Sequence, residues 1–364
     1  MSGATPAVDD PGAEQAPAVI GRFLTKRTLL SILAAVIIVA VVVWRADIPW
    51  GEAWAKIRAA NLLFYLLAIV VYYLSFVARG IRWQVLLANA GEVRKARRLA
   101  PLVVASFFVN CVVPAKMGDV YRAYLGRVRE RIPGSKALGT VVSERLLDLC
   151  VLMLLLLASG AYIFHKRNSG ALVPYVIFGA LLMAVGIGLI VMMRAGRGMR
   201  LLRLLPDPIF RRYESFRSGA VSSLGRWPTL LALTVAVWVC ESGRLGLVIA
   251  ALHFSNQVGP SQFVLVALVA ALLTTVPFTP GGVGLVQFGV TTALIIVAGI
   301  SKAAAVSIAL LDGSISYGSL LIIGFAVFAL VNFRMSRESA ASGGGHPSGH
   351  ALRDEGQPAT GSLV

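Results

Sequence analysis

The chain has 364 residues, of which 57% are hydrophobic and 14% are charged, against about 25% charged in ordinary soluble domains. Apolar runs of about 17 residues or more are long enough to cross a bilayer, and the alternating strands of a membrane β-barrel are not seen. The composition excludes a soluble domain and predicts an all-α, polytopic membrane protein. The net charge of +17 comes from short basic loops, which favours anionic lipid headgroups over nucleic acid as their partner.

The polar ends of the chain flank a long transmembrane domain, which we place over residues 21–335. Residues 1–20 and 336–364 are poor in large apolar side chains, so both tails are predicted to be disordered. The first apolar run has no clear small-residue cleavage site and is predicted to be a retained helix, not a signal peptide. Six runs are predicted to span the membrane: Thr28–Trp44, Leu62–Leu87, Ala137–Ala158, Ala171–Met193, Leu230–Leu252 and Ala303–Phe333.

Two further apolar runs, Leu99–Val113 and Gln262–Ile300, are predicted to form re-entrant hairpins. The first lies between residues 91–98 and 115–136, which carry four and six basic side chains. A spanning helix would put these stretches on opposite sides, against the positive-inside rule. A hairpin leaves both in the cytoplasm, together with the eight arginines of 194–226. We therefore expect a multi-pass protein of the cytoplasmic membrane with both termini in the cytoplasm.

A shift of 166 residues reveals an internal repeat. It aligns PAKMG with PGGVG and SKALGTVV with SKAAAVSI. An odd number of crossings separates the two copies, about 61–194 and 228–333, so the second copy is inverted. Each break predicts a cavity, because irregular backbone inside a membrane needs protein or water around it; alternatively, Pro and Gly merely kink two spanning helices. The predicted turns contain Pro114, Gly118, Pro277, Pro280, Gly281, Gly282 and Gly284.

Charged side chains within the predicted membrane segments form the candidate substrate site. Several occur three or four residues apart, within reach of each other on a helix. They are either buried ion pairs that hold helices together or ligands for a substrate. Five charges of the first copy have neutral counterparts in the second, and arginine suits bidentate phosphate contact, which favours ligands. The candidates are Arg79, Arg82, Asn110, Lys116, Asp119, Arg122, Glu144, Arg145, Asp148, Glu241, Arg244, Gln287 and Asp312.

Other chemistries lack support in the sequence. Cys111, Cys150 and Cys240 match no metal motif and are predicted to be small buried hydrophobes. The four histidines form no ligand pair on a helix. TPGGVG has no GK[ST] and no soluble strand before it, so it is not a nucleotide loop. We expect no metal and no cofactor.

Three stretches carry a family resemblance: FFVNCVVPAKMGDVYRAYL, VVSERLLDLCVL and VPFTPGGVGLVQFGV. They resemble the signature regions of the flippase-like family, the lysylphosphatidylglycerol synthase transmembrane region, and the likeness covers about residues 25–335. Gln287 departs from the pattern, because the family often has a Glu there, and this puts any proton or cation role of that position in doubt. The matching residues are Asn110, Pro114, Gly118, Asp119, Arg122, Glu144, Arg145, Asp148, Pro280, Gly281, Gly282 and Gly284.

The resemblance implies translocation of a phospholipid or lipid-linked intermediate. No aminoacyl-lipid synthesis is expected, because a short Gly/Ser-rich tail follows the membrane part where bifunctional members carry a soluble aminoacyltransferase domain. The expected partner is an anionic or phosphate-bearing lipid held by the arginines, while nearby carboxylates balance the charge or carry a proton that drives transport.

Two alternatives stay open. One is a membrane-embedded transferase or hydrolase with Glu144 or Asp148 as general base, although no nucleophile is paired with a base at helical spacing. The other is a non-catalytic partner of the enzymes that synthesise lipid or cell-envelope glycan. An enzyme is the less favoured prediction.

Overall fold

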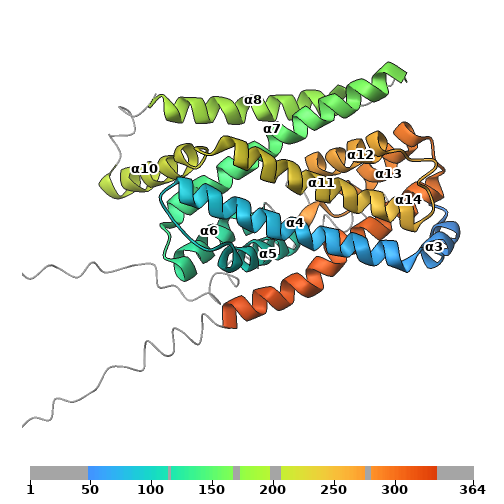
Figure 1. Ribbon diagram of the computed structural model, residues 1–364, viewed down its shortest axis with the longest axis horizontal. Coiled ribbons are helices and arrows are strands. Elements are labelled where there is room, and N and C mark those ends of the chain that lie inside the picture. Colours follow the sequence, from blue (N-terminus) through green and yellow to red (C-terminus); the bar gives the residue numbers. More distant parts are fainter. Residues whose placement is uncertain (1–47, 114–115, 167–172, 197–205, 275–279, 334–364) are drawn as a thin grey trace, which may run out of the picture.

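The computed structural model describes residues 48–113, 116–166, 173–196, 206–274 and 280–333, and the regular elements of these ranges are all helical (Figure 1). The predicted tails and the span Thr28–Trp44 lie outside them. The elements are α3 (Trp50–Arg58), α4 (Leu62–Asn89), α5 (Ala96–Val112), α6 (Met117–Glu130), α7 (Gly134–Lys166), α8 (Val173–Arg194), α10 (Asp207–Ser222), α11 (Trp227–Ala251), α12 (Pro260–Thr274), η2 (Pro280–Gly282), α13 (Leu285–Ala298), α14 (Lys302–Gly313) and η3 (Ser314–Gly324).

Three helices of the described part are long and apolar enough to cross a membrane. They are α4, α11 and the continuous helix Lys302–Phe333, which contains α14 and η3. Large apolar side chains such as Leu66, Val70 and Leu74 on α4 are half or more exposed, as a lipid-facing surface requires. The predicted spans Ala137–Ala158 and Ala171–Met193 coincide with α7 and α8. The chain is therefore an all-α polytopic membrane protein.

The first predicted hairpin consists of α5 and α6, which lie antiparallel. Near the tip, the Gly118 N–H donates to Asn110 Oδ1 at 2.8 Å. At the open end, Arg94 Nε donates to the carbonyl of Glu130 at 2.9 Å. A Cβ on Gly118 would lie 1.9 Å from the carbonyl oxygen of Ser106, so only glycine allows the arms to come this close. The run therefore turns back, as the loop charges predicted; Pro114 lies outside the described residues.

The second hairpin pairs α12 with α13. Gln262 Nε2 donates to the carbonyl of Val297 at 2.9 Å at the open end. η2 forms part of the tip, where Gly281, Gly282 and Gly284 have φ of 62°, 78° and 85°. The open ends of the hairpins lie at opposite ends of the bundle (Figure 1). An antiparallel pair of short helices is not a kinked spanning helix, so the hairpin prediction is confirmed; Pro277 lies outside the described part, and Pro280 begins η2.

The pairing of α4 with α11 supports the inverted repeat. These helices run antiparallel, since the Asn61 N–H donates to the Ala251 carbonyl at one end and Asn89 Nδ2 donates to the Ser223 carbonyl at the other, both at 2.8 Å. Midway, Ser75 Oγ lies 3.5 Å from Glu241 Oε1, and these residues are 166 positions apart. Equivalent residues that meet at the centre of an antiparallel pair mark a two-fold axis in the membrane plane.

Two short helices extend this correspondence. α3 packs on α14, and α10 packs on α7, so each lies against the helix of the other copy that begins at the matching Ser-Lys-Ala sequence. Each also directly precedes the first long helix of its own copy, α4 or α11. The predicted copies start at about residues 61 and 228. The placement of α3 and α10 favours an earlier start for both.

Candidate functional site

The tips of the two hairpins meet at a cavity of about 770 Å³ inside the bundle. A Cβ on Gly281 would lie 3.2 Å from Cys111 Cα at the end of α5, so the tips are in contact. Cys111, Gly281 and Gly282 all line the cavity, as do residues of α4, α7, α11 and the Lys302–Phe333 helix. The cavity thus lies where the sequence predicted one, at the paired Pro-Gly breaks.

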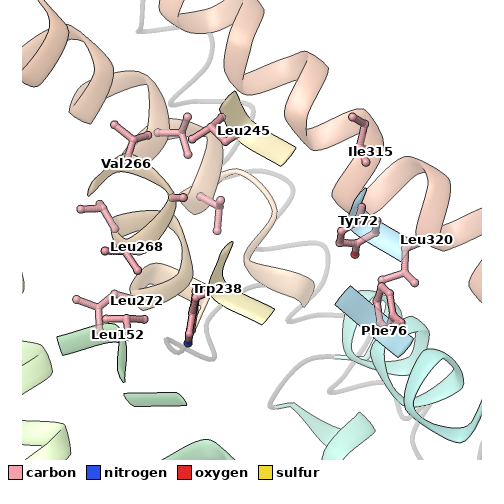
Figure 2. Close-up of a cluster of buried hydrophobic side chains, with 14 of the residues drawn as sticks. Tyr72, Phe76, Leu152, Trp238, Leu245, Val266, Leu268, Leu272, Ile315 and Leu320 are labelled. Carbon is pink, nitrogen blue, oxygen red and sulfur yellow. The ribbon is translucent and has the colours of Figure 1, made fainter. Parts of the chain in front are cut away.

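Apolar side chains form most of the cavity wall. Figure 2 shows Leu152 and Trp238 on one side of the apolar cluster and Tyr72 and Leu320 on the other, and all four line the cavity. Phe107 of α5 also contributes. The sequence gives no signal for these residues, because an aromatic or aliphatic side chain in an apolar run looks the same whether it faces core, lipid or cavity. Such walls suit an amphipathic ligand.

Tyrosines of α4 hold the wide helix η3 in place. Tyr72 Oη donates to the carbonyl of Ser316 at 3.1 Å, and Tyr73 Oη and Ser319 Oγ share a hydrogen bond at 3.1 Å. η3 has π-helical winding, which occurs often at functional sites. Ser316 and Tyr317 of η3 line the cavity. The widened turn thereby presents polar groups next to Asp312.

The predicted site residues divide into two sets. Asn110 and eight charged side chains line the cavity, whereas Arg82, Arg122, Glu144 and Gln287 do not. The eight are Arg79, Lys116, Asp119, Arg145, Asp148, Glu241, Arg244 and Asp312.

The hairpin network joins α6 to α7 and α4; its members are Arg82, Asp119, Arg122, Glu144, Arg145 and Asp148. Arg145 faces the cavity and forms a bidentate pair with Asp119, with contacts of 2.6 and 2.9 Å. Its other Nη lies 3.5 Å from Asp148. With 29% of its side chain exposed, Arg145 is the most accessible member of the network.

The rest of this network lies behind the cavity wall. Arg82 donates to Asp148 at 2.6 Å and to Glu144 at 2.9 Å, and Arg122 also pairs with Glu144. Arg82, Arg122 and Glu144 have no exposed surface, and the Arg122 guanidinium stacks 4.5 Å above the Trp83 ring. These buried ion pairs join α4, α6 and α7, as expected for charges that hold helices together.

The axis network lies across the pseudo-two-fold axis; its members are Arg79, Glu241, Arg244 and Asp312. Glu241 accepts from Arg79 at 2.8 Å and lies 3.5 Å from Arg244 of its own helix. Arg244 also pairs with Asp312 of α14, which has no charged neighbour within its own span. All four residues line the cavity.

The ion pairs mostly join different helices. Sequence spacing had placed the charges within reach along single helices, and Arg145–Asp148 and Glu241–Arg244 are such pairs, both at 3.5 Å. The shorter contacts are interhelical. The Phe107 ring links the two networks, with the Arg79 and Arg145 guanidinium carbons 4.9 and 5.6 Å from its centroid.

Gln287 caps a helix. Its Oε1 accepts from the Gly284 N–H at 2.6 Å and so satisfies the first turn of α13. Its Nε2 lies next to Gly313, where an added Cβ would be 3.0 Å away. The amide at this departure from the family pattern therefore completes the tip of the second hairpin.

Comparison with known proteins identifies the family. Residues 32–324 match the sequence profile described as "Lysylphosphatidylglycerol synthase TM region". The chain belongs to this family. A UPF0104 membrane protein of Methanocaldococcus jannaschii is 29% identical over 64% of this chain and 97% of its own length. A second UPF0104 membrane protein, from Methanothermobacter thermautotrophicus, is 24% identical over 84% of this chain and 93% of its own length.

A longer relative carries the name of an enzyme. Glycosyltransferase AglD of Haloferax volcanii is 23% identical over 91% of this chain, and the match spans 59% of AglD. Membership of the lysylphosphatidylglycerol synthase TM region family and the apolar helices agree on a multi-pass membrane protein.

Proposed function

We propose that this protein translocates a phospholipid or lipid-linked intermediate across the cytoplasmic membrane. The observation that carries the proposal is the cavity where the hairpin tips meet, which combines eight charged side chains with apolar walls inside a bundle that exposes many large apolar side chains. Charges are costly in a membrane and tend to mark substrate pathways. A phosphate-bearing headgroup is the ligand that such a site suits best.

The inverted repeat supplies a way to move the headgroup. Each hairpin enters from one end of the bundle and ends at the shared cavity (Figure 1). Rocking one copy against the other would open the cavity to each side in turn, as in other inverted-repeat transporters. The headgroup would cross next to the arginines while the acyl chains stay in lipid.

Reconstitution tests the proposal. Purified protein in liposomes with tail-labelled phosphatidylglycerol should make inner-leaflet label accessible to an external quencher, and Arg145→Gln should slow this about 10-fold or more, because a charge-assisted contact is lost. Arg211→Gln, which removes an exposed charge on α10, is the matched control. If wild-type liposomes behave like empty ones for phosphatidylglycerol and for polyprenyl phosphate, with and without a pH gradient, translocation of these lipids is refuted.

Cysteine labelling tests the proposed orientation. Arg131 and Asn256 are exposed residues beside the open ends of the first and second hairpins. With the native cysteines replaced, Arg131→Cys should react with an impermeant maleimide only from the cytoplasmic side and Asn256→Cys only from outside. Labelling of both from one side would contradict the arrangement.

A second candidate is a membrane-embedded transferase, or an accessory protein, in lipid or cell-envelope glycan synthesis. The likeness to Glycosyltransferase AglD over 91% of this chain favours it. A new modified headgroup or lipid-linked glycan in lipid extracts after expression, lost in Asp148→Asn, would support a transferase over translocation.

A further inference from the structure

Lys116 stands apart from the other charges of the cavity. The hairpin network contains three arginines and three carboxylates, and the axis network contains two of each, so both networks are balanced. Lys116 belongs to neither. Within the described residues, no hydrogen bond or ion pair reaches its ammonium, although it lines the cavity. The cavity and its supporting networks thus contain one surplus positive charge, and Lys116 carries it.

The surroundings of Lys116 favour an anion. It is the residue just before α6 and makes no side-chain capping hydrogen bond, so its ammonium lies at the positive end of a 14-residue helix. Asp119, Arg145 and Asp148 line the same cavity as Lys116, and both carboxylates are already paired with Arg145. Lys116 is thus the cation of this group without a partner among the described residues, and Arg145, although paired with Asp119 and Asp148, lines the same cavity with 29% of its side chain exposed.

Charge balance limits what the cavity can hold. An unpaired charge inside a membrane protein is costly. A ligand with one negative charge would neutralise the surplus, whereas a dianion would leave one uncompensated negative charge. A ligand with no net charge would leave the surplus positive charge unbalanced. A phosphodiester carries one negative charge, and a phosphomonoester about 1.5 to 2 at neutral pH.

We propose that Lys116 and Arg145 bind the phosphate of a single phosphodiester, and that the cavity thereby selects lipids whose headgroup has one net negative charge. The inference rests on the proposed function, because it assigns the class of lipid that this site moves. A free phosphodiester offers the same anion, but the apolar wall formed by residues such as Leu152, Trp238 and Leu320 favours a lipid.

Equilibrium binding by native mass spectrometry tests the proposal on the full chain in neutral detergent. The probes are dioctanoyl phosphatidylglycerol, dioctanoyl phosphatidic acid at pH 8, dioctanoyl phosphatidylcholine and the soluble glycerophosphoglycerol. Phosphatidylglycerol should bind most tightly. Lys116→Gln should weaken it about 10- to 100-fold, because a charge-assisted contact is lost, and should remove the preference over phosphatidylcholine.

Two variants serve as controls. Lys95→Gln removes a lysine from the open end of the same hairpin, where the side chain is exposed, and should bind like the wild type. Lys116→Arg keeps the charge and should retain the preference. Thermal unfolding of each variant shows whether it folds, and a Lys116→Gln protein that unfolds early is replaced in the comparison by Lys116→Asn, since Asn tolerates the positive φ of 53° at this position.

Several results would overturn the proposal. They are unchanged phosphatidylglycerol affinity in Lys116→Gln, tighter binding of phosphatidic acid than of phosphatidylglycerol to the wild type, and equal affinity for glycerophosphoglycerol and the lipid. The liposome assay distinguishes failure of the Lys116 proposal from failure of the proposed translocation. Translocation with the same headgroup preference in wild type and Lys116→Gln removes the role of Lys116 alone, whereas selective binding without translocation supports the site and refutes the flippase.

Discussion

The two hairpins share one backbone design but differ in charge. Both are antiparallel pairs of short helices whose tips meet at the cavity, and the matching sequences PAKMG and PGGVG lie around the start of each second arm. The first carries Lys116, Asp119 and Arg122 along that arm. The second has Gly282, Leu285 and Phe288 at the matching positions. The re-entrant fold therefore depends on tight turns and close packing, and the charges are an addition to one copy.

The glycines that match across the repeat serve different purposes. Gly118 allows α6 to touch α5, because any Cβ there would overlap the Ser106 carbonyl. Gly284 has a φ of 85°, which other residues rarely adopt. The caps differ as well, since Asn110 caps α6 from the opposite arm and Gln287 caps α13 from its own first turn. Equivalent positions of the two copies thus support the same hairpin backbone through different interactions.

The largest loss of stability should come from removing a buried charge that only the first copy carries. Glu144→Ala leaves the buried guanidiniums of Arg82 and Arg122 without their shared partner and should lower the free energy of unfolding by about 3–5 kcal/mol. The matching residue of the second copy, Leu310, is partly exposed, so Leu310→Ala should cost far less. Thermal or denaturant unfolding in detergent measures both. Similar losses of unfolding free energy in the two variants would show that the charges of the first copy do not contribute more to stability than their neutral counterparts.

The second largest loss of stability should come from disturbing the close contact between α5 and α6 in the first hairpin. Gly118→Ala should destabilise by about 3 kcal/mol, since a backbone oxygen lies 1.9 Å from the new Cβ and cannot yield without parting the arms. Gly188→Ala in α8 has no atom within 4 Å of its added Cβ and should be neutral or slightly stabilising. A tolerated Gly118→Ala would mean that α5 and α6 are less tightly packed than described.

The smallest effects should come from the two caps. Asn110→Ala and Gln287→Ala each remove the acceptor of one helix N–H and should cost about 0.5–2 kcal/mol. Asn110 also lines the cavity, whereas Gln287 does not. Lipid binding by the native mass spectrometry assay should therefore change in Asn110→Ala alone. Equal loss of binding in both variants would indicate that the caps act only through hairpin stability.

The sequence by itself determined that the protein is an all-helical, polytopic membrane protein. Apolar length and the sidedness of basic loops predicted the spans, the hairpin at Leu99–Val113 and the inversion of the second copy. These features follow from constraints that act along the chain, because a bilayer has a fixed thickness and basic loops favour one side of it. The 166-residue offset also predicted the internal repeat, and the contact between Ser75 and Glu241, which are 166 positions apart, agrees with it.

Only the tertiary structure decided how the charges combine. Helical spacing suggested neighbours on one helix, yet Asp312 pairs with Arg244 of α11, and Arg82 turns away from the cavity toward Glu144. Which arginine meets which carboxylate depends on how helices pack, and packing is set by side-chain shape across segments far apart in the sequence. For the same reason, only the tertiary structure shows that every arginine of the two networks has a carboxylate partner and that Lys116 has none within the described part of the chain.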